Sequence, residues 1–171
     1  DRSSAASDVY KRQEVAACIC ASERPVAGAR SLLLGAMRYR ALASPAFITR
    51  HFPEGVRADQ LARTPALVFG PDDFLQHRYL ASLGVDGGFE HHLCPSSEGF
   101  IRLTEAGLGW GLVPELQVRD QLQSGALVEL LPDKPIDVPL YWHHWRSGGQ
   151  LLGLLTDHLA QACGQWLVPL D

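Results

Sequence analysis

The sequence lacks several features that define common protein classes. Its 171 residues include only two lysines, Lys11 and Lys134, and no run of about 18 apolar residues of the kind that a membrane helix needs. Nineteen acidic residues outnumber fifteen basic ones, and the net charge is −4. A nucleic-acid-binding surface requires clustered positive charge, so this balance argues against one. The first thirteen residues also lack the apolar segment of a signal peptide.

Cysteine and catalytic motifs are equally sparse. None of the four cysteines forms a C-x-x-C pair, and Cys18 and Cys20 stand one residue apart on an apolar run. We interpret all four, Cys18, Cys20, Cys94 and Cys163, as reduced, buried thiols of a cytoplasmic protein, and Cys18 and Cys20 as neither a zinc pair nor part of a disulfide framework. A serine-hydrolase elbow, a phosphate-binding glycine loop and an H-E-x-x-H zinc motif are also absent. We therefore expect no catalytic residue, no metal and no cofactor; the enzymatic alternative is a small hydrolase that uses Cys94.

What is present is the composition of a globular domain. Apolar residues make up 46% of the chain and charged residues 20%, which suffices for a buried core. Apolar runs alternate with helical segments of about ten residues, and this alternation predicts an α/β fold with a mostly parallel sheet. The predicted strands are Val15–Cys20, Arg38–Ala43, Ala66–Phe69, His91–Cys94, Trp110–Val113, Leu127–Leu131 and Leu140–Trp145. The predicted helices are Pro45–His51, Asp59–Arg63, Phe74–Leu83, Ser97–Ala106, Pro114–Gln123 and Gln150–Trp166.

The clearest candidate binding feature is the turn Ser96-Ser97-Glu98, which follows an apolar strand and opens a helix. The first N–H groups of a helix have no intrahelical partner and carry partial positive charge, so they can hold a ligand carboxylate. Ligands in open α/β sheets bind outside the carboxyl ends of strands, where this turn is expected. The alternative is a capping serine and a first-turn glutamate with a purely structural role.

Two further segments carry candidate residues. Asp72 and Asp73 form a second strand-to-helix turn, where they either hold a cationic group or simply cap the helix. In the aromatic segment Leu140–Trp145, strand alternation puts Trp142 and His144 on one face and His143 on the other. Adjacent histidines on a strand do not readily bind one metal ion, so we interpret this segment as a core strand.

Several of these stretches together resemble the effector-binding domain of LysR-type transcriptional regulators. The general family pattern is carried by Ser96-Ser97-Glu98 with Phe100, by Ala106-Gly107-Leu108-Gly109 and by Leu112-Val113-Pro114. Other stretches are similar to the lysine- and arginine-responsive ArgP/LysG subfamily: Ala43-Ser44-Pro45-Ala46-Phe47, Phe69-x-x-Asp72-Asp73, Pro114-Glu115-Leu116-Gln117, Ser124-Gly125-Ala126-Leu127-Val128 and Leu140-Tyr141-Trp142-His143. The similarity extends from about residue 14 to residue 168.

The resemblance implies an α/β fold like that of type 2 periplasmic binding proteins. The family's winged helix-turn-helix has no counterpart here, so we expect an N-terminally truncated chain that contacts DNA only through a domain outside it. Residues 1–13 are predicted to be a non-native or disordered leader. Residues 14–37 would form a partial first lobe, residues 38–131 a complete second lobe, and residues 132–171 a hinge strand and closing helix that return to the first lobe.

The resemblance also implies a function: sensing lysine or arginine, to control genes of amino-acid export or metabolism. Ser96 and Ser97 would grip the α-carboxylate of the effector, and Asp72, Asp73 or Glu98 would pair with its cationic side chain. Trp142 is a weaker candidate. The implied partners are a small amino acid and, in the whole regulator, a second copy of the chain, with no membrane. The alternative within the same fold is a solute-binding protein for an amino acid.

Overall fold

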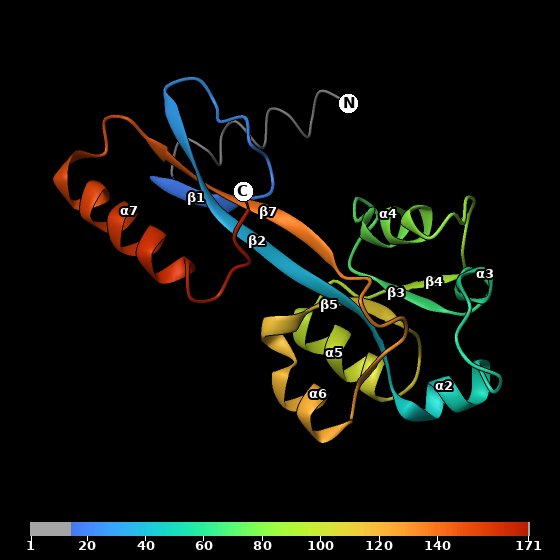
Figure 1. Ribbon diagram of the computed structural model, residues 1–171. Helices are drawn as coiled ribbons and strands as arrows, with labels where there is room; N and C mark the ends of the chain where they lie inside the picture. The colour runs from blue at the N-terminus through green and yellow to red at the C-terminus, as the bar shows by residue number, and fades with distance from the viewer. Residues whose placement is uncertain (1–14, 171) are drawn as a thin grey trace. The chain divides into compact units, whose positions relative to one another are not determined.

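The chain divides into two compact units. The structure, a computed structural model, describes residues 15–170, so the predicted leader over residues 1–13 lies outside the described residues. Unit 2 is the continuous segment Arg38–Ile136, and unit 1 consists of the described residues 15–37 and 137–170 (Figure 1). Across residues 15–170, no helix has both the length and the apolar character needed to span a membrane.

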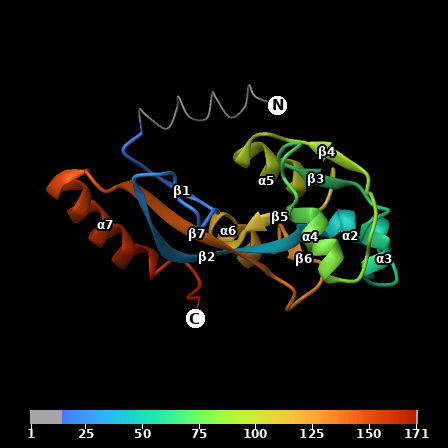
Figure 2. The same ribbon diagram turned by 90° about the horizontal axis from the view of Figure 1, so that it is seen from above.

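Unit 2 is a mixed α/β layer structure (Figure 2). The end of β2 (Ala29–Ala43) pairs antiparallel with β5 (Gly111–Pro114) and with β6 (Val128–Glu129). By contrast, β3 (Ala66–Val68) pairs parallel with β4 (His91–Leu93) and forms a parallel bridge to Trp110. The expectation of a mostly parallel sheet is therefore wrong, although the α/β class is correct. β5 and β6 both run antiparallel to β2. The apolar runs of the sequence predict where strands lie but not the direction in which neighbouring strands run.

The core of unit 2 follows from strand alternation. Ala41 and Ala43 face one side of the sheet, where they join a cluster with α2 (Pro45–His51), α3 (Ala58–Leu61) and α4 (Leu75–Ser82). Leu42, between them, faces the other side and packs against Phe100 of α5 (Ser97–Glu105). Successive side chains on a strand point to opposite faces, so one short strand supplies both halves of the core.

Local signals fix several element boundaries. The predicted helix start at Pro45 is confirmed: Pro45 lies in the first turn of α2, and Ser44 caps the helix by accepting a hydrogen bond from the Phe47 N–H at 3.3 Å. In the segment Ala106–Gly109, Gly109 lies so close to β3 that a Cβ would stand 2.9 Å from the Pro65 carbonyl oxygen. Glycine is therefore required there to let the chain enter β5.

Other boundaries differ from the prediction. The predicted helix Pro114–Gln123 is split into the 3-10 helix η1 (Glu115–Gln117) and α6 (Arg119–Ser124). The predicted strand Leu127–Leu131 pairs only over Val128–Glu129, as β6. Strand β2 begins at Ala29, nine residues before the predicted Arg38. Its first half has an exposed stretch, Arg30–Leu33, followed by a buried one, Leu34–Ala36, so it shows no strict alternation of buried and exposed residues. Within that half, the added Cβ of a residue at Gly35 would lie 2.8 Å from Leu167, and its φ is +128°.

Unit 1 contains the edge strand β1 (Ala17–Cys20), the strand β7 (Ile136–Trp145) and the long helix α7 (Gly149–Cys163). β1 pairs antiparallel with β7, with Cys18 opposite His143 and Cys20 opposite Tyr141. A small core forms where Leu152 of α7 meets Trp142 and Leu34. Two neighbouring leucines of this helix are far less covered, since Leu154 is 61% exposed and Leu151 is 81% exposed.

Candidate functional site

A cavity of about 350 Å³ in unit 2 contains two of the six predicted binding residues. Its walls come from the end of β2, the turn before α4, the first turns of α5, the end of β5 and η1. Lining residues include Tyr39, Phe69, Asp73, Ser97, Ile101 and Gln117. Polar groups on an otherwise apolar lining are the usual chemistry of a small-molecule site.

The three residues of the Ser96-Ser97-Glu98 turn occupy different positions. Ser96 is the N-cap of α5, where its Oγ accepts a hydrogen bond from the Gly99 N–H at 3.1 Å. Ser97, the first residue of the helix, lines the cavity. Glu98 instead forms an ion pair with Arg102 at 2.6 Å, and both side chains are about three-quarters exposed. Of these three, Ser97 is therefore the residue that faces the cavity, and Glu98 belongs to the outer surface of the helix.

Asp73, and not Asp72, contributes to the cavity. One carboxylate oxygen of Asp73 accepts a hydrogen bond from the Phe69 N–H at 3.1 Å and the other accepts one from the Leu75 N–H at 3.0 Å. These bonds fix the carboxylate at the start of α4, and each oxygen retains a further lone pair for a ligand. Asp72 is exposed and does not belong to the cavity wall. The structure thus separates the two adjacent carboxylates that the sequence leaves equivalent.

Tyr39 is a cavity residue that the sequence reasoning missed. It lies on β2 opposite Pro114 of β5, and burial together with the negative charge of Asp73 raises the pKa of its hydroxyl. The two residues therefore interact electrostatically in the same cavity. Tyr39 falls within the predicted strand Arg38–Ala43, but its direction depends on the register with β5, which a single sequence does not show.

An ion-pair network stands beside this cavity. Arg40 donates a hydrogen bond from Nε to Glu115 of η1 at 2.7 Å and another from Nη1 to Glu129 of β6 at 2.8 Å. These hydrogen bonds and the nearby negative charges raise the pKa of Arg40 despite its partial burial. A planar guanidinium that joins two carboxylates fixes their relative positions. It therefore holds η1, which carries the cavity residue Gln117, against the sheet.

Trp142 has a structural position in unit 1. Its indole N–H donates a hydrogen bond to Thr156 of α7 at 2.9 Å, and its ring stacks on His144 with 6.4 Å between centroids. The shared face of Trp142 and His144 agrees with strand alternation. The indole is buried in the small core beneath α7. Packing in this core therefore explains why a large aromatic residue stands at position 142.

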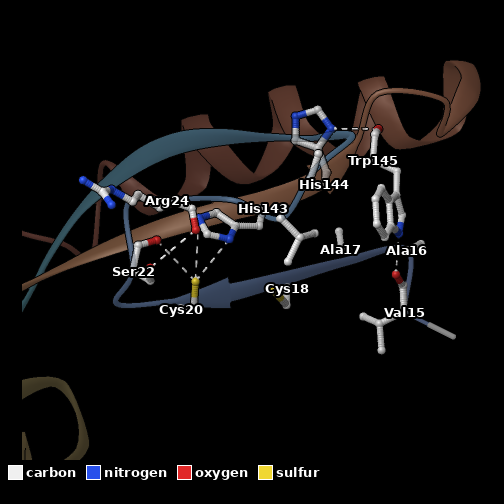
Figure 3. A pocket seen from close by; sticks show the side chains of 12 residues that line it. Val15, Ala16, Ala17, Cys18, Cys20, Ser22, Arg24, His143, His144 and Trp145 are labelled. Carbon is white, nitrogen blue, oxygen red and sulfur yellow. Dashed lines mark hydrogen bonds between the residues drawn. The ribbon is translucent and has the colours of Figure 1, made fainter. Parts of the chain in front are cut away.

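A second cavity, of about 360 Å³, lies within unit 1 (Figure 3). Its wall carries Cys18 and Cys20 of β1 and His143 of β7. Cys18 is exposed, and Cys20 and Cys163 are half-buried, so the interpretation of the four cysteines as buried thiols is wrong for these three and correct for Cys94. The signal for this cluster was two cysteines at positions i and i+2 of one strand, which share a face. From the sequence we considered only whether two adjacent histidines could bind one metal ion, and we did not consider His143 together with the cysteines.

Cys94 lies in a different environment, at the end of β4 in unit 2. It is buried, and its thiol donates to the Ser96 carbonyl oxygen at 3.7 Å. Inaccessible thiols in apolar surroundings are usually inert. This position gives the hydrolase alternative no support.

Together, the layered α/β fold and the mixed polar and apolar cavity are those of a small-molecule-binding domain of the periplasmic-binding-protein-like class. The LysR substrate binding domain family matches residues 2–166, and the chain belongs to this family. Its resemblance to LysR effector domains, identified from the sequence, is thereby confirmed.

Individual relatives make the match more specific. The chain is 87% identical over 158 residues to the HTH-type transcriptional regulator ArgP of Pseudomonas fluorescens strain Pf0-1, an alignment that covers 92% of this chain and 53% of the relative. The chain thus spans about half the length of such curated relatives. A solved structure of the C-terminal domains of a LysR family protein from Agrobacterium tumefaciens is 38% identical, with a TM-score of 0.88 and coverage of 99% and 83%.

A third relative is the full-length regulator LysG of Corynebacterium glutamicum, solved with bound effector arginine. It is 36% identical to this chain, with a TM-score of 0.78, and the match covers 95% of this chain and 55% of LysG.

Proposed function

We propose that this chain is the effector-sensing part of a LysR-type transcriptional regulator that responds to lysine or arginine. The relatives named ArgP, and the LysG structure with bound arginine, support this proposal. In the whole regulator, effector binding would control transcription of genes for amino-acid export or metabolism. The chain would act in the cytoplasm and without catalysis.

The observation that carries the proposal is that Ser97 and Asp73 line one cavity. A basic amino acid has a carboxylate at one end and a cationic group at the other. The Ser97 hydroxyl and the free N–H groups at the start of α5 suit the carboxylate, because they are donors with partial positive charge. The Asp73 carboxylate suits the ammonium or guanidinium, since a charge removed from water must be paired.

The remaining predicted residues have supporting roles in this proposal. Ser96 holds the first turn of α5, and Glu98 adds negative charge near its start, which favours the helix itself. Asp72 and Trp142 would not contact the ligand, because neither lines this cavity. Tyr39 joins Asp73 as a polar wall residue, and its hydroxyl is a further donor or acceptor for the ligand.

The regulatory step would follow from preferential binding. An effector that binds one conformation of the domain more tightly shifts the population toward it, and this difference in affinity is the signal. DNA contact would lie outside this chain, in the helix-turn-helix segment that gives HTH-type relatives their name, and would act in a homo-oligomer.

Calorimetric titration of the chain with arginine, lysine and leucine tests the proposal. The three ligands share the α-amino and α-carboxylate groups and differ in the side chain. We expect arginine and lysine to bind at least about tenfold more tightly than leucine, a difference of about 1.4 kcal/mol. Equal affinities for leucine and the basic amino acids would contradict a basic effector.

A further inference from the structure

Cys18, Cys20 and His143 form a cluster in unit 1 that the proposed function does not use. Each residue offers one ligand atom, and these three atoms lie within 4.8 Å of one another. The cluster arises from strand pairing: Cys18 is directly opposite His143, and Cys20 is two residues further along the same face of β1. The pairing of β1 with β7 therefore brings the two cysteines to a histidine that is more than 120 residues away in the sequence.

The geometry points to a binding site for a soft divalent metal ion, and we propose that this cluster binds Zn²⁺. Zinc prefers thiolate and imidazole ligands in tetrahedral geometry, with bonds of about 2.3 Å to sulfur and 2.0–2.1 Å to nitrogen. At a tetrahedral angle these bond lengths place a sulfur and a nitrogen ligand about 3.5–3.6 Å apart and two sulfur ligands about 3.8 Å apart. The Cys20 sulfur is 3.5 Å from Nδ1 of His143 and 3.8 Å from its Nε2, which is the spacing of two zinc ligands. Because the sulfur is nearly equidistant from the two nitrogens, the imidazole must rotate about its χ2 bond to direct one nitrogen lone pair at a shared ion.

The third ligand needs only a small adjustment. The Cys18 sulfur lies within 4.8 Å of the other two ligand atoms, and rotation of an exposed side chain brings it about 1 Å closer. Three protein ligands leave the fourth tetrahedral position to water, as in open zinc sites.

The surroundings are compatible with such an ion. Two thiolates and a neutral imidazole balance the two positive charges of the metal, so the complex is neutral. The cavity around it is mostly apolar, with Val26 and Ala29 among its wall residues. One cation lines the same cavity, Arg24, and its guanidinium is turned away from the Cys20 sulfur (Figure 3). Moving a neutral complex from water into this apolar cavity costs little desolvation free energy.

Bound metal would fasten the edge strand to its neighbour. β1 lies at the edge of the sheet with β7 beside it, and the two ligand cysteines and the ligand histidine sit on opposite strands of this pair. An ion that binds only the paired arrangement stabilises it by mass action. Zinc is therefore expected to raise the melting temperature of the chain.

The test uses the reduced, metal-free chain titrated with Co²⁺, whose absorption reports tetrahedral thiolate coordination, followed by displacement with Zn²⁺. One equivalent is expected to bind to the unchanged chain. Cys20→Ser and His143→Gln should each weaken binding by more than about 100-fold, because loss of a direct ligand costs more than loss of its supporting contacts. Matched controls are Cys163→Ser and His158→Gln, a thiol and an imidazole of unit 1 that belong neither to the cluster nor to the wall of this cavity; both variants should bind normally.

Protection from alkylation provides a second measurement that needs no variant. Zinc should slow maleimide labelling of Cys18 and Cys20, mapped by mass spectrometry, and leave Cys163 unaffected. Absence of tetrahedral cobalt bands, unchanged binding in Cys20→Ser, or protection of Cys163 alone would each overturn the proposal. Circular dichroism of each variant shows that lost binding is not lost folding.

Discussion

The hydroxyl of Tyr39 and the carboxylate of Asp73 face one cavity, and the charge of Asp73, after burial, is the second cause that raises the pKa of Tyr39. Tyr39 enters from the sheet, and Asp73 is fixed by two backbone hydrogen bonds at the start of α4. The cavity thus has negative potential at the Asp73 wall, opposite in sign to the partial charge at the start of α5, where Ser97 lies. A ligand that carries a cation at one end and a carboxylate at the other can therefore pair each end with a charge of opposite sign.

Adjacent serines of α5 should show different effects on substitution. Ser97→Ala removes a hydroxyl from the cavity wall and is expected to lower arginine affinity by about 10- to 100-fold, the value of a charge-assisted hydrogen bond of roughly 1.5–3 kcal/mol. Ser96→Ala removes the N-cap and is expected to lower the free energy of unfolding by about 1 kcal/mol. Calorimetry and denaturant unfolding of both variants measure the two effects. The same loss of affinity in both would show that only helix integrity matters.

Alkaline pH should destabilise the chain through the buried Tyr79. Burial and the charge of Glu129 raise the pKa of Tyr79 to about 12. A tyrosine in the unfolded chain loses its proton near pH 10, so between about pH 10 and pH 12 the folded chain binds more protons than the unfolded one. The free energy of unfolding therefore falls as pH rises through this window, by up to about 1.4 kcal/mol per pH unit for such a group.

Tyr79→Phe provides the control for this pH dependence. Among the described residues the Tyr79 hydroxyl has no hydrogen-bond partner, so its removal should cost little stability at neutral pH. Urea unfolding from about pH 9 to pH 11 should show a shallower fall for the variant than for the unchanged chain. Parallel curves for the two proteins would exclude Tyr79 as the cause.

The exposed leucines of α7 should promote self-association. Leu151 and Leu154 are largely uncovered, while Leu152 between them is buried against Trp142. Exposed apolar surface favours association in water, so Leu151→Gln and Leu154→Gln together are expected to reduce concentration-dependent aggregation without loss of stability. Leu152→Ala should instead destabilise by about 2 kcal/mol or more. Light scattering across a concentration series measures the first effect, and thermal unfolding measures the second. If the double variant aggregates as much as the unchanged chain, these two leucines do not cause the aggregation and another surface does.

The sequence predicted those features that depend on neighbours along the chain. Ser44 and Ser96 could be identified as caps because the capping bond spans only three residues. The direction of the strands next to β2 could not, since it depends on pairings between distant segments. For the same reason the sequence offered Asp72 and Asp73 as equals: their directions are set by a turn whose hydrogen bonds reach back to Phe69. The cluster of Cys18 with His143 likewise exists only through the register of β1 with β7.

The most direct test of the central claim compares arginine with citrulline, which has nearly the same shape but a neutral ureido group in place of the guanidinium. Calorimetric titration of both ligands into the unchanged chain, Asp73→Asn and the control Asp72→Asn isolates the charge pairing. We predict that the unchanged chain and Asp72→Asn prefer arginine by at least about tenfold, and that Asp73→Asn reduces this preference to near equality. A preference for arginine that persists undiminished in Asp73→Asn would contradict the assignment of this cavity as the basic-effector site.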